Sequence, residues 1–201
     1  MSSDASGAGV RTVVQCYSLF DKFFPTCGLL DYTEGIYHDD PSTPYEQAQQ
    51  NQINYLLDEV RCRRGVRILE VGCGNGTLLE EVRRRGAVGT GITISPEQAS
   101  LCRRRGLDVR LLDYRELEGQ SIGRFDAVIA NGAIEHFVQV SDAAAGKAEE
   151  IYARMFRILH GAIDPKSSIR RMVNTTTHFV RCPDPTSLLA GPLLLRPFPD
   201  D

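Results

Sequence analysis

The sequence has little of what marks a secreted, membrane-spanning or metal-stabilised protein. Its six cysteines form no CxxC pair and no cluster with histidine, which disfavours a zinc site. The first residues have neither a charged n-region nor an apolar h-region, so no signal peptide is predicted. No stretch reaches the roughly 18 apolar residues that a membrane-spanning helix needs. These absences predict a cytoplasmic protein with reduced thiols and no membrane span.

An excess of basic charge is also lacking, since the formal net charge is −3 over 201 residues. That length and a 42% hydrophobic content are typical of about one globular domain with its own core. Many of the arginines stand before a glycine where predicted helices end, in the segments 61–65, 83–86 and 103–106. Cations and a left-handed glycine are typical of helix C-termini, so we interpret these segments as caps and predict no nucleic-acid partner.

Strand-like and helix-like segments alternate between residues 66 and 175. Short apolar runs predict strands at 66–71, 87–94, 107–112, 125–130 and 169–174. Helical spacing and capping signals predict helices at 77–85, 96–105 and 143–159, with Ser95 as the N-cap of the second. Such alternation is typical of βαβ units. It predicts an α/β fold with a doubly wound, mostly parallel sheet that binds ligands at the carboxyl ends of its strands.

Different patterns flank this α/β domain, which we expect to span residues 61–181. Residues 1–10 are small and polar, and we expect a disordered N-terminus there. Residues 11–60 predict an N-terminal helical cap segment, whose second helix begins near Tyr45 with Thr43 as its N-cap. Residues 182–201 hold five prolines and are predicted to form an irregular tail.

A glycine-rich turn, Gly72 to Gly76, follows the first predicted strand and precedes a helix. Glycines let a ligand approach the backbone closely, and the helix N-terminus presents its amides to an anion. The spacing is GxGxG rather than GxGxxG, and Thr93 stands where a dinucleotide-binding fold has an acidic residue. The turn therefore indicates a ligand site that departs from the NAD pattern, with an ordinary ligand-free turn as the plain alternative.

Several further motifs, taken as a set, resemble one family. Together with the glycine turn they are similar to class I S-adenosylmethionine-dependent methyltransferases, and within these to cyclopropane-fatty-acid synthases and mycolic-acid methyltransferases. The similar segments are 70–76, 91–98, 113–117, 125–128 and 134–137, with 30–37 upstream. The resemblance implies a Rossmann-like, seven-stranded sheet, S-adenosylmethionine as cofactor, and an unsaturated or electron-rich carbon as methyl acceptor.

The resemblance also implies which residues hold the cofactor. The methionine half of the cofactor would lie against Gly72, Gly74 and Gly76, beside Glu70. The ribose would face Thr93 and Gln98, and the adenine would face Asp113 and Tyr114. The sulfonium would face Tyr32 and Thr33. Each has a structural alternative, because helix caps and packed cores use the same residue types.

Two positions depart from the family's bicarbonate site, where the ion accepts the proton released after methyl transfer. Glu34 stands in place of a cysteine ligand and Asn174 in place of a histidine, while Glu135 is retained. We predict Glu135, just after the fourth strand, and Glu34 as the catalytic carboxylates. A solvent-exposed loop is the alternative for Glu34. His136 is predicted to point away from the site as a structural residue.

The resemblance implies C-methylation of an unsaturated lipid-like, isoprenoid or polyketide small molecule. Two alternatives stay open, namely N-methylation of a small molecule and an inactive module that only binds S-adenosylmethionine. The inactive module is suggested because the family fold continues with two strands that have no counterpart after residue 178, so C-terminal strands are expected to be missing. The sequence indicates no oligomeric state.

Overall fold

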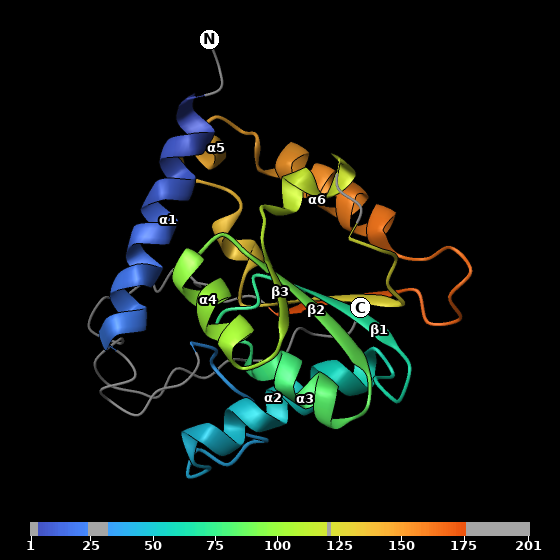
Figure 1. Ribbon diagram of the computed structural model, residues 1–201. Helices are drawn as coiled ribbons and strands as arrows, with labels where there is room; N and C mark the ends of the chain where they lie inside the picture. Colours follow the sequence, from blue (N-terminus) through green and yellow to red (C-terminus); the bar gives the residue numbers. More distant parts are fainter. Residues whose placement is uncertain (1–3, 24–31, 120–121, 176–201) are drawn as a thin grey trace.

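The computed structural model describes residues 4–23, 32–119 and 122–175. Its centre is a sheet of five parallel strands in the order β3-β2-β1-β4-β5 (Figure 1). The strands are β1 (Arg67–Val71), β2 (Val88–Thr93), β3 (Asp108–Leu111), β4 (Ala127–Asn131) and β5 (Arg171–Thr175). The predicted parallel α/β sheet is therefore confirmed.

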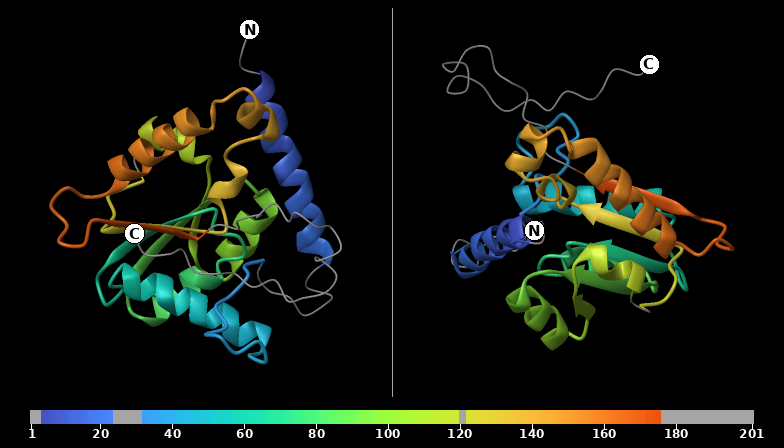
Figure 2. Two further views of the ribbon diagram at one scale, coloured as in Figure 1. Left: turned by 180° about the vertical axis from the view of Figure 1, so that it is seen from behind. Right: turned by 90° about the horizontal axis from the view of Figure 1, so that it is seen from above.

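Helices cover both faces of the sheet, as the two views in Figure 2 show. One face packs against α2 (Tyr45–Glu59), α3 (Thr77–Arg84) and α4 (Pro96–Arg104). The other face packs against α6 (Ala148–Ala162) and the 3-10 helix η2 (Tyr114–Gly119). The remaining elements are α1 (Asp4–Phe23), η3 (Ile134–His136) and α5 (Val140–Ala144).

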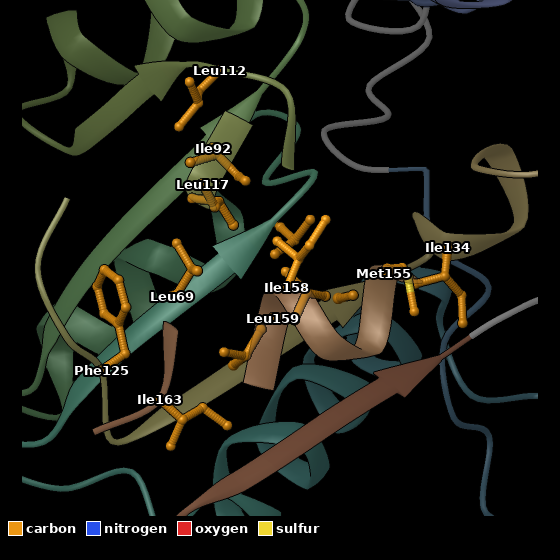
Figure 3. Close-up of a cluster of buried hydrophobic side chains, with 13 residues drawn as sticks. Leu69, Ile92, Leu112, Leu117, Phe125, Ile134, Met155, Ile158, Leu159 and Ile163 are labelled. Carbon is orange, nitrogen blue, oxygen red and sulfur yellow. The ribbon is translucent and has the colours of Figure 1, made fainter. Parts of the chain in front are cut away.

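Successive side chains of a strand point to opposite faces of the sheet, and so each strand contributes to a hydrophobic core on either face. Ile68 and Ile129 contribute to the cluster beneath α2 and α3, whereas Leu69 and Val128 contribute to the cluster beneath α6. Figure 3 shows this second cluster, in which Leu69 of the sheet lies opposite leucine and isoleucine side chains of α6. Burying each such side chain stabilises the fold by about 1.5–3 kcal/mol. The layers therefore follow from the period-two pattern of the strands.

The N-terminal region differs from expectation in two ways. Helix α1 begins at Asp4, within the segment 1–10 for which disorder was expected, while residues 1–3 lie outside the described part. Once a helix is nucleated, each added residue gains one hydrogen bond, so it extends through small polar residues. Helix α2 shares a core with the sheet, so the packing continues across the domain boundary expected at residue 60.

Two local predictions also need correction. The segment predicted as one helix over 143–159 is divided into α5 and α6, because Gly146 takes φ +70° and ends the first helix. The N-cap of α2 is Pro44 rather than Thr43, whose hydroxyl donates to the Tyr37 carbonyl at 3.4 Å. The arginine–glycine caps are as predicted for α3 and α4, where Gly86 and Gly106 follow the C-cap residue with φ of +74° and +73°. The cap predicted at 61–65 is wrong, because α2 already ends at Glu59 with Val60 as its C-cap, and Gly65, with φ +83°, lies in the turn before β1.

The strand order sets where a ligand site forms. The chain passes from β1 through α3 to β2 on one side of β1, and after β3 it continues to β4 on the other side. This reversal of the strand order leaves a crevice at the carboxyl end of β1. None of the helices within the described residues combines the length and apolar character needed to cross a bilayer. The expected tail at 182–201 and the question of further strands lie outside the described residues.

Candidate functional site

A cavity of about 350 Å³ opens at the carboxyl ends of β1, β2 and β4. Its size is within the range of small-molecule sites. Eight of the ten predicted cofactor-binding residues line it, together with both predicted catalytic carboxylates. These lining residues are Tyr32, Thr33, Gly72, Gly74, Thr93, Gln98, Asp113, Tyr114, Glu34 and Glu135.

The glycine turn forms the floor of the cavity at the end of β1. The backbone amides of Gly72 and Cys73 both donate to the Ile92 carbonyl, at 2.9 and 3.1 Å, which holds the turn against β2. Gly72 and Gly74 have φ of +71° and +49°, values that other residues adopt only with strain. A Cβ at Gly74 would meet no protein atom within 4 Å, so this position leaves space for a ligand.

Gly76 and Glu70 are the two predicted cofactor residues that do not line the cavity. Gly76 has φ +81° and forms the N-cap of α3. A Cβ there would lie 2.6 Å from the Leu107 side chain and 2.9 Å from Cys102 Sγ, so this glycine serves close packing. Glu70 is 3% exposed within β1, and its charge contributes to raising the pKa of Cys73 in the turn. The carboxyl group of Glu70 therefore lies in the sheet near enough to the turn to influence the Cys73 thiol.

The end of β2 presents a buried polar pair. The Thr93 hydroxyl donates to Gln98 Oε1 at 2.9 Å, and the Ser95 amide donates to Thr93 Oγ1 at 3.1 Å. Ser95 in turn accepts from the Gln98 amide at 3.3 Å, which is the cap predicted for α4. The cap therefore orients the same side chains that reach the cavity wall.

Asp113, after β3, is held by its neighbour Arg115. The Arg115 side chain donates to both carboxylate oxygens, at 2.9 and 2.5 Å, and its backbone amide adds a third bond at 2.9 Å. Burial raises the pKa of Asp113, but these hydrogen bonds and the Arg115 charge outweigh burial and lower it overall. Asp113 is thus kept as an acceptor-only carboxylate. The adjacent Tyr114 ring stacks on Phe137, with centroids 4.4 Å apart at 20°.

The segment before α2 forms another part of the cavity wall. The Thr33 carbonyl accepts from the Tyr45 hydroxyl at 2.5 Å and from Gln49 Nε2 at 3.2 Å, so α2 anchors Thr33. A Cβ at Gly132 would lie 3.8 Å from Thr33 Cγ2 and 3.9 Å from Glu135 Oε1. This places the segment holding Thr33 close to the first residues after β4.

His136 lies elsewhere than predicted, because it lines the cavity instead of pointing away. Its Nε2 forms a 2.7 Å hydrogen bond with the Tyr17 hydroxyl, and the two rings meet edge to face at 5.5 Å. The partner belongs to α1, far away in the sequence, so no local pattern could indicate it. Asn174 lies in β5 opposite Ala130 and does not line the cavity.

Helix α1 supplies wall residues that sequence reasoning missed. Val13, Val14 and Tyr17 line the cavity, and Ser18 donates to Glu97 of α4 at 3.3 Å. Figure 1 shows α1 beside α4, at one side of the sheet. The helical spacing of these residues identifies an amphipathic helix, but a cavity wall and an ordinary core give the same pattern.

Charges in the cavity are mostly negative. Among the lining residues in the described part of the chain, Arg115 is the single arginine, and it is paired with Asp113. The carboxylates that line the cavity are Glu34, Asp113, Glu135 and Asp142. A site with this balance favours a ligand that carries positive charge.

The family of the chain follows from comparison with known proteins. The family model described as mycolic acid cyclopropane synthetase matches residues 7–179. The chain belongs to this family. The resemblance found in the sequence motifs is therefore confirmed.

Curated relatives match over part of their length. A segment of 109 residues is 39% identical to the "Probable fatty acid methyltransferase" of Pseudomonas putida and covers 50% of this chain and 27% of that protein. Over 96 residues the chain is 36% identical to the cyclopropane-fatty-acyl-phospholipid synthase of Escherichia coli K12, covering 45% of this chain and 24% of that protein. The matches thus span about a quarter of these relatives.

Solved structures share the fold. A mycolic acid cyclopropane synthase complexed with SAH and CTAB has a TM-score of 0.61 and 25% identity, over 76% of this chain and 52% of that chain. The [4+2]-cyclase SpnF has a TM-score of 0.62 and 23% identity, over 78% of this chain and 57% of that chain. These matches confirm the Rossmann-like architecture of the sheet.

Proposed function

We propose that this chain binds S-adenosylmethionine in the cavity and transfers its methyl group to an unsaturated carbon of a small lipid-like, isoprenoid or polyketide molecule. The observation that carries the proposal is the glycine turn. It ends β1 at the base of a cavity, with open space at Gly74, in a chain of the mycolic acid cyclopropane synthetase family. That combination matches a ligand whose polar end must approach the backbone.

The charges of the cavity fit this cofactor. S-Adenosylmethionine carries a sulfonium, an ammonium and one carboxylate, so its net charge is positive. Four carboxylates and a single arginine line the cavity within the described residues, and that arginine is already paired. The buried Glu70 carboxyl lies beneath the turn as a further acidic group. An anionic cofactor such as NAD would meet repulsion here.

The chain offers groups for each part of the cofactor. Gly72 and Gly74 would contact the methionine half, with Glu70 acting on the amino group from beneath the turn. The Thr93–Gln98 pair would face the ribose hydroxyls. Asp113 and Tyr114 would contact the adenine, for which an acceptor-only carboxylate matches an exocyclic amino donor.

When bound, S-adenosylmethionine supplies an electrophilic methyl group. The chain then has to align the acceptor and exclude water, and α1 contributes to this by closing one side of the cavity with Val13 and Val14. Methylation of an alkene leaves positive charge on the acceptor and a proton to be removed. Glu135 would stabilise that charge and Glu34 would accept the proton, replacing the bicarbonate of related enzymes.

The substitution Gly74→Val tests cofactor binding. A branched side chain would fill the space where the backbone meets the ligand, and we expect titration calorimetry to detect no S-adenosylmethionine binding. Gly65→Val is the matched control. Gly65 also has a positive φ, and a Cβ there meets no atom within 4 Å, but it lies before β1, at the opposite end of the sheet. Unchanged affinity in Gly74→Val would contradict the proposal.

A second candidate, methylation of an amine, is favoured by the aromatic rings beside the carboxylates. Tyr17 and Tyr32 both line the cavity, with ring centroids 5.9 Å apart, and such faces attract ammonium groups. Mass spectrometry of S-adenosylhomocysteine formation with matched alkene and amine acceptors separates the two functions. Turnover of the amine alone would replace C-methylation as the proposed reaction, and turnover of neither by a protein that binds the cofactor would indicate a binding module.

A further inference from the structure

Two buried cysteines lie beneath the glycine turn. Cys73 belongs to the turn itself and is 4% exposed, while Cys102 on α4 is fully buried. The Cys73 thiol donates a hydrogen bond to Cys102, and Cys102 Sγ donates to the Gly74 carbonyl at 3.5 Å. The two sulfurs are therefore neighbours across the contact between the turn and α4.

The two thiols are electronically unlike. The hydrogen bond from Cys73 lowers the pKa of Cys102, assisted by the charge of Arg105 and opposed by burial. The same hydrogen bond, together with burial and the charge of Glu70, raises the pKa of Cys73 well above its ordinary value. One thiol that ionises more readily beside one that keeps its proton is the arrangement of an attacking and a resolving cysteine.

The pair is close to the cavity in spite of its burial. Gly74 lines the cavity, and its carbonyl contacts Cys102 directly. The proposed route of a small oxidant from the cavity to Cys102 Sγ therefore passes the Gly74 carbonyl. A ligand seated on Gly74 would block that route.

We propose that Cys73 and Cys102 form a peroxide-sensitive pair that closes to a disulfide and thereby distorts the glycine turn. In the first step the Cys102 thiolate attacks hydrogen peroxide, the O–O bond breaks, and a sulfenic acid and hydroxide form. The Cys73 sulfur then attacks the sulfenic sulfur, forms the S–S bond and expels a second hydroxide. The protons of the two thiols convert these hydroxides to water, so two thiols are oxidised and one peroxide is reduced to two waters.

Closure must disturb the turn because its geometry is tight. The Cys73 amide is hydrogen-bonded to Ile92, and a Cβ at Gly91 would lie 2.7 Å from Cys73 Sγ. Pulling this sulfur to bonding distance of Cys102 shifts the backbone between Gly72 and Gly74. The expected loss of S-adenosylmethionine binding rests on the proposed function, whereas formation of the disulfide does not.

Peptide mapping of the peroxide-treated natural chain tests the disulfide. Mapping without reductant should find a peptide pair joined through Cys73 and Cys102 that lacks two hydrogen atoms, and dithiothreitol should separate it. Cys16 is exposed and serves as the internal comparator. Saturating S-adenosylmethionine should slow formation of the joined pair. Oxidation of Cys16 while Cys73 and Cys102 stay reduced would overturn the proposal.

A variant with serine at the other four cysteines isolates the effect on binding. In this background, peroxide should lower S-adenosylmethionine affinity about tenfold or more, and dithiothreitol should restore it. The same background with Cys102→Ser is the control and should show no loss that dithiothreitol reverses. A mapped disulfide with unchanged affinity would overturn the switch. Absence of cofactor binding in the reduced chain would instead refute the proposed function, and the mapping would still decide whether the pair oxidises.

Discussion

The contact between Gly72 and Ala133 predicts a specific pattern of stability changes. Gly72 has φ +71°, and a Cβ on it would lie 2.7 Å from the Ala133 Cβ, where real carbon atoms do not approach. The substitution Gly72→Ala therefore adds backbone strain of about 1–2 kcal/mol and a steric clash of about 1–3 kcal/mol. We expect the free energy of unfolding to fall by about 2–5 kcal/mol.

Gly74→Ala is the internal reference for this measurement. Gly74 has φ +49°, and a Cβ there meets no atom within 4 Å, so only the strain of about 1–2 kcal/mol applies. The double variant Gly72→Ala/Ala133→Gly removes the clash and leaves the strain. The double-mutant cycle should therefore show a coupling of about 1–3 kcal/mol between the two positions.

Equilibrium urea unfolding, followed by far-ultraviolet circular dichroism, measures these differences without any ligand. The reasoning would be refuted if Gly72→Ala and Gly74→Ala were equally stable, or if Ala133→Gly gave no rescue. Either result would mean that the turn after β1 and the loop after β4 do not pack as closely as described.

Two further predictions concern the chemistry of the cavity. Glu34→Gln should lower turnover by about 10²-fold or more while cofactor affinity by calorimetry barely changes, and the parent should need no added bicarbonate; full activity of the variant would show another route for the proton. Arg115→Met should raise the pKa of Asp113, since burial then acts without the opposing hydrogen bonds. In the parent the Asp113 pKa is depressed, so its stabilising contribution is present above the unfolded value near 3.8 and is lost only as the pH falls through the lower folded pKa. From pH 7 to about 5, titration of Asp113 should leave the free energy of unfolding and the cofactor affinity of the parent unchanged. In the variant the folded state takes up the Asp113 proton before the unfolded chain does, so its free energy of unfolding should rise as the pH falls, while its cofactor affinity should weaken as the carboxylate loses its charge. Identical profiles would contradict the role of Arg115.

Local sequence determined the elements of this protein. The short apolar runs located each of the five strands to within about two residues, because central strands such as β1 and β4 are buried on both faces of a parallel sheet and therefore have consecutive apolar side chains. Ser95 predicted its own cap on α4, since the bonding partners lie within three residues. The glycine turn was equally readable, because positive φ is a property of single residues.

Tertiary structure decided what those elements surround. Tyr17 and His136 are 119 residues apart and meet only because α1 packs beside the end of the sheet, so no local signal could show that His136 faces the cavity. Gly76 fits the turn motif, yet its close contacts are with Leu107 and Cys102, which reach it from other elements. Sequence patterns record the conformation that each segment prefers. Cavity walls, thiol pairs and ion pairs depend on distances between segments, and those are set when the two cores close around the sheet.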